Sequence, residues 1–218
     1  MKLALIDYGS GNIHSVSRAV THAATEMGID FELVLTDRAE QVAASDAIIL
    51  PGVGHFADCY HSLSSVDGLL DALHEAVMVQ AKPFLGICVG MQLLADHGLE
   101  GGVQTDALGW IGGVVDRLPS HLRTEQGLKI PHMGWNNLQP RAASHRVLSQ
   151  MTLPAQAYFV HSYFYQQIPP EQVLAVAEYG VEIPALIGKD NLLATQFHPE
   201  KSQQVGQAFL RSFLSWKP

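Results

Sequence analysis

The sequence predicts an α/β fold built on a mainly parallel, open sheet flanked by helices. Two features support this prediction. Apolar runs of strand length show little alternation of polar and apolar residues, which is typical of strands buried on both faces. Segments with helical spacing lie between these runs in the first half of the chain, as in consecutive β-α-β units. With 218 residues, 47% of them hydrophobic, we expect a single domain over residues 1–218.

The predicted elements alternate regularly in the first half of the chain. Strands are expected at residues 2–6, 31–35, 46–50 and 83–87, and helices at 13–27 and 66–80. This order places helices between neighbouring parallel strands. Active sites of such sheets gather at the carboxyl ends of the strands, so the loops that leave those ends are the first places to look for chemistry.

The second half of the chain is less regular. Apolar runs predict strands at residues 157–163, 173–179, 184–188 and 192–197. A last helix is expected over 203–215, because Val205, Phe209 and Phe213 recur on one helical face. The Gly- and Pro-rich stretch 98–140 predicts irregular strands and loops.

Charge and cysteine content restrict the class of protein. A formal net charge of -8 offers no basic surface for nucleic acid or for an anionic membrane. The apolar run at residues 2–6 is too short for a signal peptide or a membrane span. We therefore expect a cytoplasmic protein without nucleic-acid or membrane partners. In that reducing compartment its two cysteines, Cys59 and Cys88, should not form a disulfide.

The stretch Gly86-Ile87-Cys88-Val89-Gly90 has the form of a nucleophile elbow with cysteine as the nucleophile. A sharp turn after the strand at 83–87 would expose the sulfur, and a helix starting there would favour its thiolate. The N–H of Val89 would then be placed to stabilise an oxyanion. Taken alone, a small buried cysteine that only fills the core explains the stretch equally well.

A histidine and a carboxylate follow the strand predicted at 192–197, in the order His198-Pro199-Glu200. A cysteine nucleophile needs a base that also protonates the leaving group, and the base needs a carboxylate to orient it. A capping or surface histidine is the alternative, with weight because the chain has 11 histidines. The occurrence of H-P-E downstream of a cysteine elbow favours a catalytic pair.

Two glycine-containing loops follow other strands. Pro51-Gly52-Val53-Gly54 would let the amide of Val53 or Gly54 act as a second oxyanion donor, although a plain Gly/Pro turn also explains it. It lacks the G-x-x-x-x-G-K-[ST] pattern of a phosphate loop. Gly9-Ser10-Gly11 begins like a dinucleotide fingerprint, but His14 stands where glycine is required. The histidines show no zinc spacing, so neither a metal nor a cofactor is expected.

Taken together, the motifs resemble those of the class I (triad) glutamine amidotransferases, which pair a G-x-C-x-G elbow with a downstream H-P-E. Within that family, six stretches are similar, in the expected order, to the glutaminase subunits of imidazole glycerol phosphate synthase. They are DYGSGNIHSV (7–16), PGVGHF (51–56), GICVGMQLL (86–94), PHMGWN (131–136), YFVHSY (158–163) and QFHPEKS (196–202). The resemblance implies a class I glutamine amidotransferase-like, flavodoxin-like fold. The segment 96–110 departs from the family, which usually has an acidic stretch there, and Val89 replaces a usual leucine.

The resemblance also implies site roles. Cys88 would be the nucleophile, His198 the general acid/base and Glu200 the residue that orients it. The backbone of Val89, with that of Val53 or Gly54, would form the oxyanion hole. The implied reaction is attack of Cys88 on the side-chain amide of L-glutamine, release of ammonia and hydrolysis of a glutamyl thioester. By the same resemblance, the residues near the glutamine are Gln92, His161, Ser162 and Tyr163.

The implied partner is a (β/α)8-barrel cyclase/synthase subunit of imidazole glycerol phosphate synthase, in a heterodimer. That subunit would use the ammonia to make imidazole glycerol phosphate and an aminoimidazole carboxamide ribotide (AICAR) in histidine biosynthesis. Trp135 suits an interface anchor because its loop is otherwise polar, although a partly buried core aromatic is the alternative. The residues expected at the interface are Asn12, Trp135, Asn136, Tyr158 and Lys201.

Three alternatives stay open at this stage. The chain could be the glutaminase of another amidotransferase, one that makes anthranilate, GMP or carbamoyl phosphate, although PHMGWN and PGVGHF argue against these. It could be a stand-alone cysteine hydrolase of α/β-hydrolase or DJ-1-like type, but such enzymes do not place histidine and glutamate in one H-P-E loop. It could also be a non-catalytic module, against which the intact Cys88, His198 and Glu200 speak.

Overall fold

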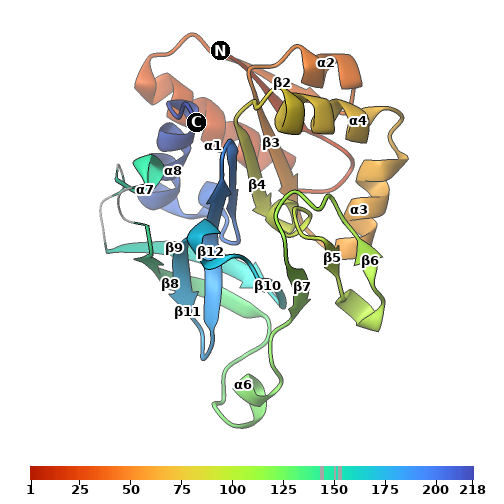
Figure 1. The fold of residues 1–218 in the computed structure, drawn as a ribbon. Helices are drawn as coiled ribbons and strands as arrows, with labels where there is room; N and C mark the ends of the chain where they lie inside the picture. The colour runs from red at the N-terminus through yellow and green to blue at the C-terminus, as the bar shows by residue number, and fades with distance from the viewer. Residues whose placement is uncertain (143–144, 150, 152–153) are drawn as a thin grey trace.

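A nine-stranded sheet forms the centre of the computed structural model, which describes residues 1–142, 145–149, 151 and 154–218 (Figure 1). The strand order is β2-β1-β3-β4-β13-β12-β11-β8-β9. The first five strands in this order pair in parallel. They are β2 (Glu32–Thr36), β1 (Lys2–Ile6), β3 (Ala47–Gly52), β4 (Phe84–Cys88) and β13 (Leu192–Thr195).

The other half of the sheet is antiparallel throughout. Its strands are β12 (Glu182–Lys189), β11 (Val173–Glu178), β8 (His132–Pro140) and β9 (Ala155–His161). A second, four-stranded sheet lies beside the large one and has the order β10-β7-β5-β6. Its strands are β10 (Tyr163–Gln166), β7 (Val114–Arg117), β5 (His97–Gly98) and β6 (Thr105–Asp106).

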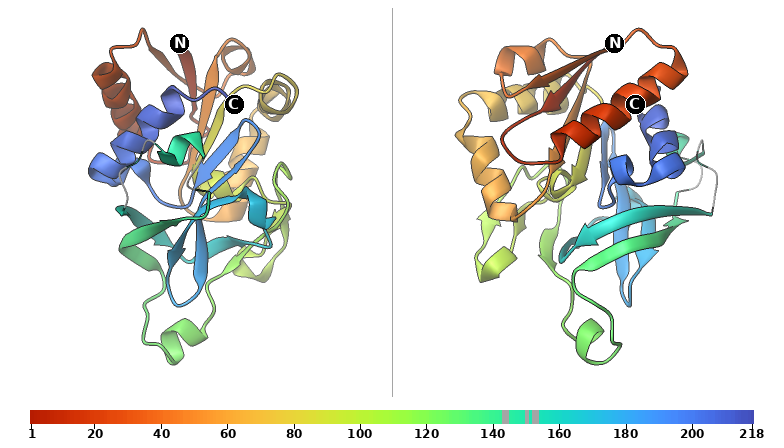
Figure 2. Two further views of the ribbon diagram at one scale, coloured as in Figure 1. Left: turned by 60° about the vertical axis from the view of Figure 1, so that its left-hand side comes forward. Right: turned by 180° about the vertical axis from the view of Figure 1, so that it is seen from behind.

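Helices cover both faces of the parallel half (Figure 2). α1 (Ile13–Met27) and α8 (Gln203–Leu214) pack together on one face, and α2 (Ala39–Ala43), α3 (Phe56–Ser65) and α4 (Leu69–His74) lie on the other. The two longest helices, α1 and α8, each turn an apolar stripe to the sheet, and their buried residues recur at helical spacing. In α8 these include Phe209, Leu210 and Phe213. The strands between the two helical layers, such as residues 3–6 and 47–50, are therefore fully buried.

The remaining helical elements are short. They are α5 (Val89–Gln92), α6 (His121–Thr124), α7 (Arg146–Ser149), a π-helical turn (Glu75–Val79) and 3-10 turns at Glu100–Gly102, Pro170–Gln172 and Pro199–Lys201. None of the helices in the described part of the chain combines the length and apolar character needed to cross a membrane.

The predicted α/β fold is confirmed, with a correction to the sheet. All eight predicted strand positions contain strands, and the helices predicted at 13–27 and 203–215 match α1 and α8 within one residue. A mainly parallel sheet holds for the first half of the chain only. The second half forms antiparallel hairpins, because short turns such as those at Gly180 and Asp190 join its strands and leave no room for crossover helices.

Two segments divide where one element was predicted. The apolar run 157–163 belongs to two strands, β9 and β10, which lie in different sheets on either side of Ser162. The helix predicted at 66–80 is α4 followed by the π-helical turn. The stretch 98–140, predicted as irregular, also contains the nine-residue strand β8.

Candidate active site

Strand β4 stands between β3 and β13, and this order brings the predicted site together. In the parallel register Cys88 pairs with Gly52 of β3, and Ile87 pairs with Thr195 of β13. The three strands therefore end side by side. A pocket of about 660 Å³ lies at this edge. It is lined by Gly11, Asn12, Val53, Gly54, Cys88, Val89, Gln92, Glu100, Pro131, Val160, His161, Ser162, Tyr163, His198 and Lys201.

Cys88 occupies the tight turn that its glycine neighbours predict. Its φ of 55° and ψ of -110° fall in a region that a residue with a side chain rarely adopts, so the backbone is strained there. A Cβ on Gly90 would lie 1.9 Å from the carbonyl oxygen of Leu50, and a Cβ on Gly86 would lie 2.6 Å from that of Gly90. Only glycine fits at both positions. The following helix, α5, is a single turn of four residues.

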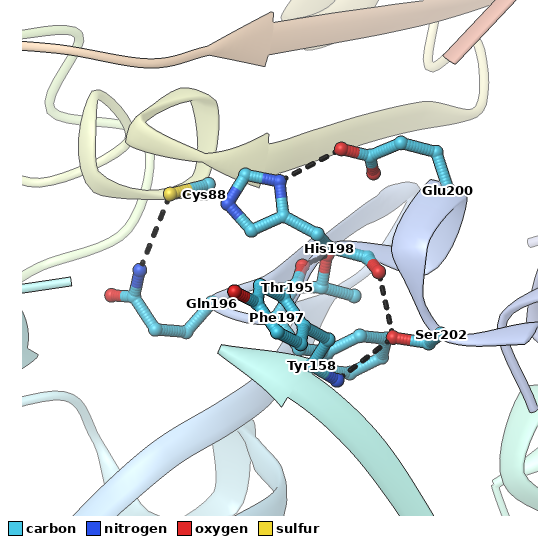
Figure 3. Close-up of polar contacts among 8 residues, drawn as sticks. All are labelled: Cys88, Tyr158, Thr195, Gln196, Phe197, His198, Glu200 and Ser202. Atoms are coloured by element: carbon cyan, nitrogen blue, oxygen red, sulfur yellow. Dashed lines mark hydrogen bonds and ion pairs between the residues drawn. The ribbon is translucent and has the colours of Figure 1, made fainter. Parts of the chain in front are cut away.

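His198 and Glu200 form a buried pair in the turn after β13. His198 Nδ1 lies 2.8 Å from Glu200 Oε1, and each side chain is 1% exposed. The other ring nitrogen, Nε2, has no hydrogen-bond partner and is directed at Cys88 (Figure 3). The carboxylate thus fixes the ring with its free nitrogen toward the sulfur, the arrangement expected of a base and its orienting group.

The neighbours of His198 decide its charge. Burial by itself would lower the pKa of this ring, but the charge of Cys88 and the bond to Glu200 act more strongly in the opposite direction. Together they raise the pKa of His198 from 6.5 to about 10. A raised pKa favours the protonated ring, which is suited to hold a thiolate and to give a proton to a leaving group.

The H-P-E turn is tied to β9 by two backbone positions. The N–H of His198 donates to the carbonyl of Tyr158 at 2.9 Å. The Ser202 hydroxyl donates to the carbonyl of His198 at 2.6 Å and accepts from the N–H of Tyr158 at 3.0 Å (Figure 3). Ser202, which sequence reasoning did not select, therefore holds the backbone of His198 against strand β9.

The loop Pro51-Gly52-Val53-Gly54 reaches the same pocket as Val89, as predicted for an oxyanion hole. Two of its carbonyls are held by side chains. The Tyr8 hydroxyl donates to the carbonyl of Pro51 at 2.9 Å, and the Ser10 hydroxyl donates to that of Val53 at 2.8 Å. Cys59, a free cysteine like Cys88, also donates to the Val53 carbonyl, at 3.4 Å.

The four residues predicted near the glutamine, Gln92, His161, Ser162 and Tyr163, all line the pocket. The ring of His161, however, uses both nitrogens inside the protein. Its Nδ1 lies 3.0 Å from the Tyr163 carbonyl and its Nε2 lies 3.0 Å from His132 Nδ1. With these partners the ring supports the wall of the pocket and has no nitrogen left for a ligand.

Sequence reasoning missed two residues of the site. Glu100 lines the pocket and accepts the N–H of Phe56 at 2.6 Å. It lies in the 96–110 segment that departs from the family, and a lone glutamate there gave no signal. Gln196 is fully buried, with its Nε2 3.8 Å from Cys88 Sγ. It ends the apolar run 192–197, where its polarity was the only available signal.

The residues predicted to face a partner divide into two groups. Trp135 and Tyr158 are cross-strand neighbours with ring centroids 5.9 Å apart, and Lys201 lies over the Tyr158 ring. Trp135 is 46% exposed, so the interpretation as a core aromatic is wrong. Asn12 lines the pocket, whereas Asn136 turns its amide inward, to His132 and to the carbonyl of Glu178.

Acidic, histidine and cysteine side chains do not gather into a cluster of metal-binding type anywhere in the described residues. The pocket brings together a cysteine on a strained turn, a buried histidine bound to a carboxylate, and the backbone of Val53, Gly54 and Val89, which are the groups that cysteine chemistry requires.

Comparison with known proteins agrees with this geometry. The model of the family described as "Glutamine amidotransferase class-I" matches residues 4–215. A protein of Rhodospirillum rubrum named "Imidazole glycerol phosphate synthase subunit HisH" is 49% identical over 218 residues and covers 100% of both chains. A protein of Brucella melitensis with the same name is 47% identical over 222 residues, again with 100% of both chains covered.

Solved structures give the same fold. The glutaminase domain of CTPS from Trypanosoma brucei, with bound acivicin, superposes with a TM-score of 0.69 at 15% identity and covers 99% of this chain and 92% of that one. A crystal structure described as a glutamine amidotransferase gives a TM-score of 0.68 at 20% identity, with 97% and 96% covered. At these identities the likeness concerns the fold.

Proposed function

The chain belongs to the class I glutamine amidotransferases, and from this premise we propose that it hydrolyses L-glutamine with Cys88 as nucleophile, His198 as general acid/base and Glu200 as the orienting carboxylate. One observation supports these roles above the others. The unpartnered Nε2 of a buried, carboxylate-bound imidazole faces the cysteine of a strained elbow. Such an arrangement activates a thiol and supplies a proton from the same ring.

The reaction proceeds in two halves. The Cys88 thiolate attacks the side-chain carbonyl carbon of glutamine, and the amides of Val89 and of Val53 or Gly54 stabilise the oxyanion. His198 gives its Nε2 proton to the amide nitrogen, so that the C–N bond breaks and ammonia leaves. Water then attacks the thioester, His198 takes up a proton from it, and the C–S bond breaks to release glutamate and restore the thiolate.

Substrate selection uses the charge of the pocket walls. Glu100 is the acidic residue and Lys201 the lysine among the lining side chains, and one charge of each sign suits a ligand with an α-ammonium and an α-carboxylate group. Gln92, Ser162 and Tyr163 add polar groups to the same lining. Glu100 is accordingly our candidate for the α-ammonium group of glutamine.

The ammonia serves a (β/α)8-barrel cyclase/synthase subunit of imidazole glycerol phosphate synthase, which makes imidazole glycerol phosphate and AICAR in histidine biosynthesis. The names of full-length relatives support this destination, because they are called subunits of that synthase. Free ammonia is mostly protonated at neutral pH and is then no nucleophile. Transfer inside a heterodimer keeps it reactive, with residues 1–218 acting as a single glutaminase domain in the cytoplasm.

The partner docks beside the mouth of the pocket, on the surface formed by Trp135, Tyr158 and Lys201. An exposed tryptophan packed edge-on against a tyrosine is a frequent anchor of protein interfaces. Asn12 extends this surface into the pocket, where ammonia would leave.

Glutamine hydrolysis by this chain, alone and with the barrel subunit and its ribonucleotide ligand, tests the proposal. We expect little glutamate from the isolated chain and rapid release in the loaded complex. Cys88→Ala in the same complex is the matched control. Equal turnover with and without the barrel subunit would contradict the partner, and unchanged turnover in Cys88→Ala would contradict the nucleophile.

A further inference from the structure

Gln196 is a buried amide in direct contact with the reactive sulfur. Its side chain is fully buried, and its Nε2 lies 3.8 Å from Cys88 Sγ, within range of a hydrogen bond to sulfur. Figure 3 shows it on the side of the sulfur away from His198. The reaction described above does not use it, although few groups lie as close to the nucleophile.

The orientation of this amide follows from an atom that can only accept. Gln92 Nε2 lies 3.0 Å from the carbonyl oxygen of Tyr163, so the Gln92 atom there must be the nitrogen. The same nitrogen lies 3.0 Å from Gln196 Oε1, to which it gives its second proton. The remaining amide atom of Gln196, which faces Cys88, is therefore the NH2 group. The usual ambiguity of a glutamine amide does not arise.

A second branch of the network holds the Tyr163 carbonyl. His161 Nδ1 must donate to it, so His161 Nε2 must accept from His132 Nδ1. The other nitrogen of His132 then accepts from the amide of Asn136, at 3.2 Å. This chain requires two neutral rings. Burial lowers the pKa of His132 to about 4, and burial with the neighbouring His132 lowers that of His161 to about 3.

We propose that Gln196 is a further catalytic residue, which donates an N–H to the Cys88 thiolate, and that His132 and His161 are positioning residues that fix the direction of this donation. The inference rests on the proposed function and deepens it. A donor to a charged sulfur is stronger than one to a neutral thiol, so it favours the thiolate before attack. It acts again when the thioester breaks and the sulfur recovers its charge.

The pH profile of Cys88 alkylation tests this inference without glutamine or a partner. Iodoacetamide reacts with the thiolate, and mass spectrometry of the Cys88 peptide separates it from Cys59. Gln196→Met keeps the length of the side chain and removes the donor. We expect the midpoint of its profile to move up by about one pH unit, a tenfold slower alkylation below the midpoint. Gln196→Leu, a shorter apolar replacement, also removes the donor and should move the midpoint in the same direction.

Asn191→Leu is the matched control. Asn191 lies just before β13, as Gln196 lies just after it, and it is a buried amide that donates to the carbonyls of Val77 and Lys82. Its loss should leave the midpoint unchanged whatever it does to stability. If one Gln196 variant does not fold, the other decides, since both lack the donor at neutral pH.

The outcomes for the inference and for the proposed function are separate. A wild-type midpoint in folded Gln196→Met or Gln196→Leu overturns the donor role, even where the wild type hydrolyses glutamine. A shifted midpoint supports it even if glutaminase activity is absent. His161→Phe, which removes the donor to the Tyr163 carbonyl, should shift the midpoint in the same direction by less than Gln196→Met. No shift there overturns the positioning role.

Discussion

The two halves of the large sheet carry buried histidines whose pKa values are shifted in opposite directions. In the parallel half, His198 lies between Cys88 and Glu200, and its pKa is raised to about 10. In the antiparallel half, the hydrogen bonds of His132 and His161 go to each other, to an amide and to a carbonyl, with no carboxylate among them. Burial lowers their pKa values to about 4 and about 3. Burial is common to all three rings. The partner, not the depth, decides whether a histidine becomes a proton donor or a neutral support.

The same division separates chemistry from docking. The parallel strands β3, β4 and β13 end at the pocket and place there Cys88, the loop 51–54 and His198, to which the proposed chemistry belongs. The antiparallel strands β8 and β9 carry Trp135 and Tyr158 on the exposed side and the histidine pair on the buried side. Substitutions in one half should therefore change properties that substitutions in the other half leave alone.

Cys88→Ala should have the largest effect and should act on chemistry only. In the complex, we expect glutamine turnover to fall by about 10³-fold or more, since no other group can form the thioester. Binding of the barrel subunit should persist, because the aromatic pair of the proposed docking surface, Trp135 and Tyr158, lies in the antiparallel half. Glutamate release and a titration of the partner measure the two effects. Loss of binding together with turnover would contradict the division.

Glu200→Gln should weaken catalysis by about 10²-fold to 10⁴-fold, because the neutral amide no longer selects the ring orientation and tautomer that present Nε2. It should also change the pH dependence of stability. In the wild type the raised pKa of His198 stabilises the fold fully below pH 6.5, and this stabilisation is lost as the pH rises toward 10. Without the carboxylate this stabilisation should be smaller, and its loss should be complete at a lower pH.

Urea unfolding between pH 6.5 and pH 9.5 measures this change in the free energy of unfolding. The two proteins should differ most near pH 6.5, and their free energies of unfolding should converge toward the alkaline end of the range. Parallel curves for the wild type and Glu200→Gln would show that Glu200 does not hold the charge of His198.

Trp135→Ala should show the reverse of Cys88→Ala: it should weaken binding of the barrel subunit and leave the chemistry at Cys88 in place. Because the side chain is 46% exposed, its removal should change the stability of the isolated chain little. Affinity for the barrel subunit should fall by roughly 30-fold, about 2 kcal/mol, as for an interface anchor. Calorimetric titration with the partner gives the affinity. Met133→Ala, on the same face of β8 and 61% exposed, is a control for a nearby apolar residue.

His132→Gln should have the smallest effect and the opposite pH dependence to Glu200→Gln. A buried neutral histidine stabilises the fold above pH 6.5, and this is lost as the pH falls toward its native pKa of about 4. Each such ring adds a slope of up to about 1.4 kcal/mol per pH unit. The variant should therefore lose less stability between pH 6.5 and pH 4.5 than the wild type. The exposed His14→Gln is the control, and equal slopes in wild type and His132→Gln would refute the assignment.

The sequence predicts the parallel half better than the antiparallel half, for a physical reason. Strands buried on both faces appear in the sequence as continuous apolar runs. The loops that follow β3, β4 and β13 contain the residue types that indicate the chemistry. Cys88, His198 and Glu200 were found in this way. In the antiparallel half, β8 was missed because Gly134 and its polar neighbours interrupt the apolar alternation.

Side-chain direction was beyond the reach of motif reasoning. His161 was predicted near the glutamine, and it does line the pocket, but its ring nitrogens bind His132 and the Tyr163 carbonyl. Asn136 was predicted to face a partner, and its amide turns inward. Gln196 lies near the end of an apolar run and was predicted only as part of a strand. Which atom meets which depends on register and on χ angles, and neither can be read from one sequence.

The Ser202 hydroxyl joins the backbone of His198 to that of Tyr158, the cross-strand neighbour of Trp135. His198 and strand β9 are therefore linked, and a shift of β9 at Tyr158 would move the backbone of His198. Thermodynamic linkage makes this coupling reciprocal in the proposed heterodimer. If the barrel subunit raises the affinity for glutamine through this link, bound glutamine must raise the affinity for the barrel subunit by the same factor.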